Sequence, residues 1–255
     1  MFNWTNLNKT FIYDGTFEGL LTIVFDCFKE KAIPFNIVNK KDNINSFLEN
    51  YEYINTDLDK SFRVFTGITK QISESVLYNS YSAFLSGEIN KEIHIFKYLI
   101  YGFLNGSKVE YIRNLDFVFE VQRLSKKVML EAHRFKGILR FKLINDNILY
   151  AEFEPDNNII EALSKHFKQR LKNEKWIIHD KKRKVISMYD MKEYRILNLG
   201  EYTQENFNII DNLDKDMYED LWKVFYNTIS IKERKNSKLQ MQYMPKRYWK
   251  YIIEC

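Results

Sequence analysis

Carboxylates and imidazoles between residues 154 and 180 are the side chains of this sequence best suited to acid–base chemistry. In the stretch EPDNN, Glu154 and Asp156 flank a proline where a helix is predicted to begin. Two neighbouring carboxylates can serve acid–base or metal chemistry. Further on, His166 lies beside an apolar stripe, and the pair His179-Asp180 precedes a run of cations. A His-Asp pair beside cations can activate water or bind a phosphate.

These observations give four candidate catalytic residues: Asp156, His166, His179 and Asp180. A simpler interpretation stands beside each of them. Asp156 is well placed to be the N-cap of the helix that follows it, and single histidines near a core edge are usually hydrogen-bonded there. The catalytic interpretation requires all four side chains to converge on one pocket.

A second kind of chemistry, polyanion binding, is indicated near the C-terminus. Residues 231–254 read IKERKNSKLQMQYMPKRYWKYIIE, with seven Lys or Arg against one acid between positions 231 and 250. Cations interleaved with aromatics and amides are typical of surfaces that hold phosphates and stack on bases. The predicted nucleic-acid-binding residues here are Arg234, Lys235, Lys238, Gln240, Gln242, Lys246, Arg247, Tyr248, Trp249 and Lys250. Alternatively, the aromatics pack on their own domain and position the charges, with Pro245 separating a basic helix from an aromatic anchor.

Residues 165–184 form a second basic segment, with nine Lys or Arg against Glu174 and Asp180. A solvated helix face would explain it, but an acidic segment at 201–220 separates the two basic ones, which a uniformly solvated surface does not require. We expect Arg170, Lys182 and Arg183 to extend the phosphate track. The net charge of the whole chain, +5, is too small to indicate a polyanion partner by itself.

Familiar catalytic signatures are absent from the sequence. It contains no Gly-rich phosphate loop, no G-x-S-x-G, no H-E-x-x-H and no C-x-x-C. Two cysteines far apart and four scattered histidines predict neither a disulfide framework nor a zinc site, so we predict no metal and no cofactor. Without a signal-peptide pattern or an apolar run of about 18 residues, a cytoplasmic protein with no membrane partner is predicted.

Helices dominate the elements predicted for the N-terminal half. A short strand at 9–13 precedes a helix with apolar residues at Phe17, Leu20, Leu21, Val24, Phe25 and Phe28, capped by Asp14 or Thr16. Strand-like pieces are predicted at Phe35–Val38 and Phe62–Phe65. Three further helices are predicted at 69–85, 91–104 and 112–132.

After residue 134 the apolar period changes from helical to alternating. The pattern predicts an antiparallel ββαβββ unit, with one helix laid across the sheet and opened by Pro155-Asp156. The acidic segment 201–220 leads into a helix, followed by the basic aromatic tail. We therefore predict an α+β protein forming a single compact domain over 1–255, with subregions 1–132, 133–200 and 201–255.

Four stretches in order along the chain carry a family resemblance: YDGTFEGLLTIVFD (13–26), EPDNNIIEALSKHFKQR (154–170), WIIHDKKR (176–183) and the tail 231–254. Together they resemble a bacterial family of DNA-repair or DNA-metabolism proteins. Members are typically encoded beside a radical-SAM DNA-modification protein, and many are fused to a uracil-DNA-glycosylase-like domain. The resemblance implies DNA and a radical-SAM protein as partners, with a glycosylase-like protein acting in trans. Relatives often read His where this chain has Asn157, which argues against catalysis at that position.

The leading hypothesis is a nucleic-acid-binding accessory subunit that presents DNA to a radical-SAM partner. The first alternative is an enzyme that hydrolyses nucleic acid, glycosylase- or nuclease-like. The second is a protein–protein adaptor that docks through its aromatic C-terminus.

Overall fold

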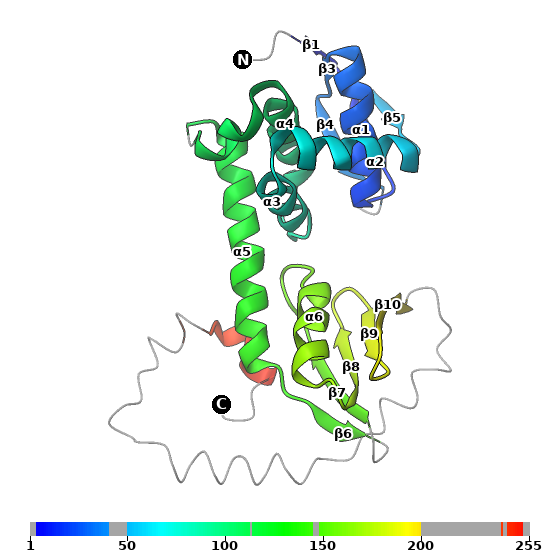
Figure 1. Ribbon diagram of the computed structural model, residues 1–255, viewed down its shortest axis with the longest axis vertical. Coiled ribbons are helices and arrows are strands. Elements are labelled where there is room, and N and C mark those ends of the chain that lie inside the picture. Colours follow the sequence, from blue (N-terminus) through cyan, green and yellow to red (C-terminus); the bar gives the residue numbers. More distant parts are fainter. Residues whose placement is uncertain are drawn as a thin grey trace. The chain divides into compact units, whose positions relative to one another are not determined.

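Helices and strands both contribute to the fold, with helices concentrated in the N-terminal half, as predicted (Figure 1). The computed structural model describes residues 4–40, 50–112, 114–144, 148–199, 241 and 244–251; side chains 250 and 251 are not described. The chain divides into two compact units, Met1–Met129 and Leu130–Cys255. This division lies close to the predicted boundary at 132/133, and the single domain stays a prediction.

A small parallel sheet forms the strand layer of the first unit. β2 (Thr10–Tyr13) is fully buried and lies between β4 (Asn36–Asn39) and β5 (Tyr51–Tyr53), both parallel to it. β1 (Thr5–Asn6) and β3 (Ala32–Ile33) form a separate parallel pair. Burial on both faces explains why β2 reads TFIY, without polar alternation.

The first helix, α1 (Phe17–Glu30), follows β2 as predicted. Thr16 is its N-cap, since its hydroxyl accepts a hydrogen bond from the Gly19 amide at 3.0 Å. Asp14 supports the cap by accepting from the Thr16 amide at 2.9 Å and the Thr16 hydroxyl at 2.7 Å. The helix ends at Lys31, whose left-handed backbone lets its amide donate to the Cys27 carbonyl.

The next helices differ from the sequence prediction in two places. Phe62–Phe65, predicted as a strand, belongs to α2 (Leu58–Gly67), because Ser61, Val64 and Ile68 bury one helical stripe and Asp57 caps the helix. The predicted helix 69–85 is two elements, the π-helix η1 (Ile68–Ile72) and α3 (Glu74–Phe84). They separate at Ser73, whose extended backbone ends one element and whose side chain caps the next.

α4 (Lys91–Asn105) is the central helix of this unit, and a 3-10 turn, η2 (Gly106–Tyr111), follows it. α5 (Asp116–Ile138) runs beyond the predicted end at 132. It continues because Phe135 and Ile138 extend the buried stripe by nearly two further turns.

The second unit contains the predicted order ββαβββ. Its elements are β6 (Lys142–Ile144), β7 (Ile148–Phe153), α6 (Ile160–Arg170), β8 (Lys175–Asp180), β9 (Val185–Tyr189) and β10 (Tyr194–Asn198). They form one sheet in the order β10-β9-β8-β7-β6, with α6 over one face (Figure 1). The prediction of a wholly antiparallel sheet was wrong, because β7 and β8 pair in parallel. A strand–helix–strand crossover returns the second strand in the direction of the first.

A 3-10 helix, η6 (Lys246–Tyr251), lies near the end of this unit. Its buried Tyr248 packs edge-on against Phe135 of α5, which packs in turn against Phe153 of β7. The C-terminal segment therefore contributes to the core of the second unit. Within the part of the chain that the structure describes, no helix combines the length and apolar character needed to span a membrane.

Candidate functional site

Polar side chains gather beyond the carboxyl ends of β7 and β8. These strands are parallel neighbours, so their carboxyl ends meet at one edge of the sheet. Asp156 and Asn157 follow β7, and Asp180 ends β8 before the turn 181–184. The crevice at the carboxyl ends of parallel strands is where open α/β sheets commonly bind ligands.

Glu131 of α5 is the centre of this network. It is 4% exposed, and its carboxylate accepts from the Asp156 amide at 2.8 Å and the Asn157 amide at 2.9 Å. The Asn157 side-chain amide donates to it at 2.5 Å, and the Tyr248 hydroxyl donates as well. A buried carboxylate with four donors is a fully satisfied structural group.

Tyr248 ties η6 to this carboxylate. The residue is 1% exposed, and its hydroxyl oxygen lies 3.5 Å from the Asp156 carboxylate in addition to contacting Glu131. Burial and the hydrogen bond to Glu131 raise the pKa of Tyr248, so the phenol stays a neutral donor. With its ring packed on Phe135, this tyrosine positions the chain and presents no face for base stacking.

Arg183 fixes the loop after β7 to the end of β8. Its guanidinium donates to the Asp180 carboxylate at 3.0 Å, to the Pro155 carbonyl at 3.2 Å and to the Asp156 carbonyl at 2.6 Å. Asp180 is fully buried, and burial raises its pKa while Arg183 opposes that shift. Arg183 thus uses much of its donor capacity inside the protein.

Asp156 is the point where the two basic segments meet. Its carboxylate, about one-third exposed, forms an ion pair with Arg247 and lies 4.0 Å from the Lys182 ammonium. Arg247 also lies over the Tyr248 ring, 4.8 Å from its centroid, and donates to the hydroxyl at 3.1 Å. Arg247 and Lys182 keep 56% and 53% of their side-chain surface exposed.

The predicted catalytic residues divide into two groups. Asp156 and Asp180 are linked through Arg183. His179 precedes Asp180 on β8 and therefore points to the opposite face of the sheet, where its Nδ1 lies 2.9 Å from the Tyr150 hydroxyl. Burial lowers the pKa of His179, with Glu152 opposing that shift and Lys181 adding to it.

His166 lies on α6, edge-on to Phe167 at 5.0 Å between ring centroids. Burial, followed by the charges of Lys136 and Arg170, lowers its pKa. Among the described contacts, neither His166 nor His179 therefore reaches the network around Asp156.

The predicted nucleic-acid-binding residues are also spread. Lys246 is exposed, whereas Trp249 is partly buried and its indole N–H donates to the Met244 carbonyl at 2.9 Å. Arg170 is the last residue of α6 and lies near the start of β8, whereas Lys182 follows the end of that strand. Because β8 is six residues long, about 20 Å of strand separates Arg170 from Lys182. The Lys250 side chain and Arg234, Lys235, Lys238, Gln240 and Gln242 lie outside the described residues.

Asp156 does not cap α6 as predicted. The helix begins later, at Ile160, and Ile159 at its N-cap position makes no side-chain cap. The ion pairs with Arg247 and Lys182 hold the Asp156 carboxylate elsewhere.

Glu131, the centre of the network, was missed by the sequence prediction, although the sequence carries a signal for it. It falls among Leu124, Val128, Phe135 and Ile138 at alternating spacings of four and three, so a carboxylate stands on the apolar seam of a helix.

Chemically, the arrangement consists of satisfied carboxylates surrounded by solvent-facing cations. Within the described ranges, no group of three His, Cys, Asp or Glu side chains is placed to hold a metal ion. The exposed cations at this edge include Lys181, Lys182, Lys246 and Arg247, and they lie beside the part-exposed carboxylates of Glu152 and Asp156. Such an edge is suited to binding anions.

Fold and site together define a mixed α/β protein with a cationic edge organised around buried carboxylates. The chain belongs to the family described as a domain of unknown function, DUF4130, which residues 89–254 match. No curated protein matches the chain.

Proposed function

We propose that the second unit binds the phosphates of nucleic acid, and that the protein serves DNA repair or DNA metabolism as an accessory subunit. The observation that carries the proposal is the meeting of Lys182 and Arg247 at the Asp156 carboxylate. It joins the two basic segments through residues that lie 65 positions apart in the sequence.

The charges at this edge favour phosphate over other ligands. Lys181, Lys182 and Arg247 keep 44%, 53% and 56% of their side-chain surface exposed while one end of each lies near a carboxylate. Exposed ion pairs of this kind are worth roughly 0–1 kcal/mol, so a phosphate can replace the carboxylate as partner at little cost. A spread of Lys and Arg also matches a backbone of repeated charges better than a single small anion.

The aromatic residues have a positioning role in this proposal. Tyr248 holds Arg247 in place, because the guanidinium lies over the Tyr248 ring and donates a hydrogen bond to its hydroxyl. The interpretation in which charges bind and aromatics position is therefore the one we retain. A radical-SAM protein as the working partner, and a uracil-DNA-glycosylase-like protein in trans, follow from the resemblance of the four sequence stretches alone.

The test is DNA binding by a charge-removing triple variant, Lys181→Gln, Lys182→Gln and Lys246→Gln, in the full chain. Fluorescence anisotropy with labelled single- and double-stranded oligonucleotides is measured over a salt series. Each lost phosphate contact should lower the slope of log affinity against log salt by roughly 0.7 to 0.9. The expected result is a loss of at least tenfold in affinity at low salt together with a shallower slope.

A matched control removes three cations from the opposite end of the same sheet: Lys172→Gln, Lys175→Gln and Lys192→Gln. All three are exposed and the net charge change is the same. Equal losses in both variants would mean that total charge, not this edge, attracts DNA. No binding at low salt by the unaltered protein would refute the proposal.

A further inference from the structure

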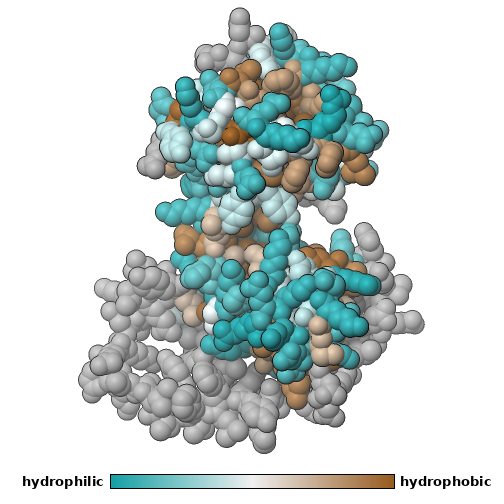
Figure 2. All heavy atoms as spheres, in the orientation of Figure 1, coloured by the Kyte–Doolittle hydropathy of each residue, from teal (hydrophilic) through white to brown (hydrophobic). Residues whose placement is uncertain are grey.

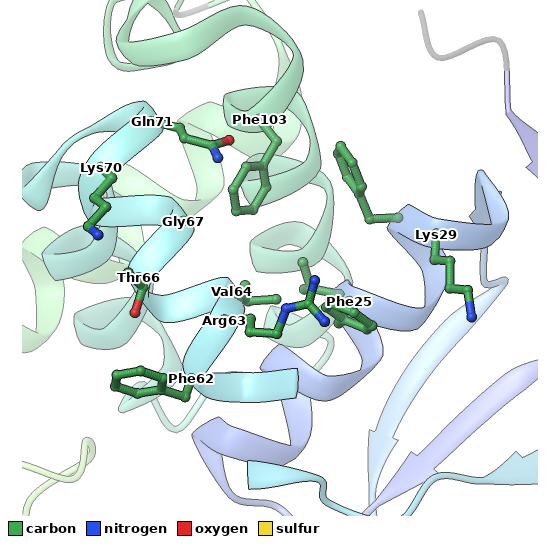
Figure 3. A pocket seen from close by; sticks show the side chains of 12 residues that line it. Phe25, Lys29, Phe62, Arg63, Val64, Thr66, Gly67, Lys70, Gln71 and Phe103 are labelled. Atoms are coloured by element: carbon green, nitrogen blue, oxygen red, sulfur yellow. The ribbon is translucent and has the colours of Figure 1, made fainter. Parts of the chain in front are cut away.

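The first unit carries a groove that the proposed function does not use. It encloses about 510 Å³ and is bounded by α1, α2, η1 and the end of α4 (Figure 3). Phe25, Phe28, Phe62 and Phe103 supply much of its apolar wall. Pockets of roughly 300 to 1,000 Å³ with mostly apolar walls are typical binding sites.

An exposed apolar ridge on α2 continues from the groove. Leu58, Phe62 and Phe65 are 68%, 69% and 44% exposed and lie at positions i, i+4 and i+7. The buried stripe of the same helix, Ser61, Val64 and Ile68, faces the core. α2 is therefore apolar on a second face, and Figure 2 shows hydrophobic side chains at the surface of this unit among hydrophilic ones. Three large apolar side chains at helical spacing form the pattern by which one helix packs on another.

The groove is positively charged. Lys29, Arg63 and Lys70 line it, and among the described lining residues none is acidic. The Arg63 guanidinium lies over the Phe25 ring, 4.9 Å from its centroid, so a cation is held at the apolar wall itself (Figure 3). An occupant must then combine apolar side chains with negative charge.

Gly67 lies at the groove where α2 passes into η1. A Cβ at this position would lie 3.1 Å from the Phe103 ring, a close contact that would require the ring to shift by a few tenths of an ångström. Single π-helical turns inside helical segments occur frequently at functional sites. The groove thus lies at a junction whose geometry departs from a continuous α-helix.

We propose that this groove and the α2 ridge bind an amphipathic helix of a partner protein, with apolar anchors spaced i, i+4, i+7 and Asp or Glu beside them. In helix-in-groove recognition, apolar anchors of the bound helix enter an apolar cleft, and the α2 ridge adds apolar side chains at helical spacing against which that helix packs. The cations Lys29, Arg63 and Lys70 pair with the partner's acids. Single-stranded nucleic acid also binds cationic grooves with open aromatic rings, and the experiment below distinguishes it from a helix.

The test uses two synthetic helical peptides with the same Leu anchors at i, i+4, i+7 and i+11, one with Glu and one with Lys at the flanking positions. Binding to the full-length protein is measured by fluorescence anisotropy. The Glu peptide should bind at least tenfold more tightly at low salt, and the difference should shrink as salt screens the charges. Phe62→Ala should weaken Glu-peptide binding at least fivefold.

Phe119→Ala is the matched control, since Phe119 is 54% exposed but does not line the groove; it should leave binding unchanged. Lys70→Glu should reduce the preference for the Glu peptide over the Lys peptide. The proposal is overturned if neither peptide binds or if both bind equally. It is also overturned if Phe62→Ala weakens oligonucleotide binding, or dissociates a homodimer seen by light scattering, because then nucleic acid or a second copy occupies the groove.

Discussion

At the scale of single residues, the second unit depends on one buried carboxylate and the donors around it. Glu131 brings together the loop after β7 and the 3-10 helix η6, because both donate to it. A buried acceptor that loses a donor costs far more than an exposed one, since water cannot replace the bond. The C-terminal segment is therefore held by a specific hydrogen bond as well as by the packing of Tyr248 on Phe135.

Tyr248→Phe tests this hydrogen bond, because it removes the hydroxyl and keeps the ring. We expect the free energy of unfolding to fall by about 1–3 kcal/mol, the cost of a buried polar group that loses its partner. Urea denaturation followed by circular dichroism measures it. Tyr189→Phe is the control, since its hydroxyl makes a longer bond of 3.3 Å to the Lys172 carbonyl. A loss for Tyr248→Phe no greater than that of the control would contradict the role assigned to Tyr248.

At the scale of elements, helix α1 packs so closely on the end of β2 that one position excludes any side chain. A Cβ at Gly19 would lie 2.6 Å from an Asp14 carboxylate oxygen, 2.8 Å from the Thr56 hydroxyl and 2.9 Å from the Tyr13 ring. Asp14 in turn accepts from Thr16 and Thr56, which joins the start of α1 to the segment that leads into α2. The carboxyl end of β2 is thus a crowded junction built on hydrogen bonds.

Gly19→Ala should therefore destabilise the protein by about 1–3 kcal/mol, the usual cost of overpacking. Gly137→Ala, in helix α5, should instead stabilise it by about 0.5–1 kcal/mol, because a Cβ there meets no atom within 4 Å and alanine is the better helix former. Thermal and urea denaturation of both variants give the comparison. Equal changes of the same sign would show that the close approach at Gly19 is not maintained in solution.

At the scale of the whole molecule, the family match and the compact units do not coincide. The match begins at residue 89, just before α4, whereas the first unit extends to Met129. α4 is the core of that unit, with Ile95, Phe96, Tyr98, Leu99 and Ile100 all fully buried. Its burial requires helices that precede residue 89, including α1, against which it packs. The family region therefore shares its core with sequence outside the match.

We accordingly expect a fragment of residues 89–255 to expose the apolar faces of α4. Removing α1 and α3 uncovers side chains that bury fully only in the longer chain, and large exposed apolar patches cause association. The fragment should bind an apolar fluorescent dye strongly and elute as aggregates in size-exclusion chromatography, unlike the full chain. A monomeric fragment with cooperative unfolding and no dye binding would show that residues 89–255 form a folding unit by themselves.

Much of the element order follows from the local sequence pattern. Periods of 3.6 and 2 are properties of local side-chain spacing, so α1 and the order ββαβββ could be read from the pattern. Local pattern does not determine strand direction or the breaks within a helical run. The parallel pairing of β7 with β8 and the interruption at Ser73 were therefore found only in the folded chain.

The site shows the same division more sharply. The residue types at 154–157, 180–183 and 246–248 marked them as candidates, because carboxylates, cations and aromatics are unusual in such density. The contacts of the folded chain were needed to show that Arg183 is held by carbonyls and Asp180, and that Tyr248 is buried. They also show that Lys182 and Arg247 meet at one carboxylate. These are contacts between residues as much as 117 positions apart, as for Tyr248 and Glu131. Long-range contacts of this kind depend on how the sheet and helix α5 pack, and no local period encodes that.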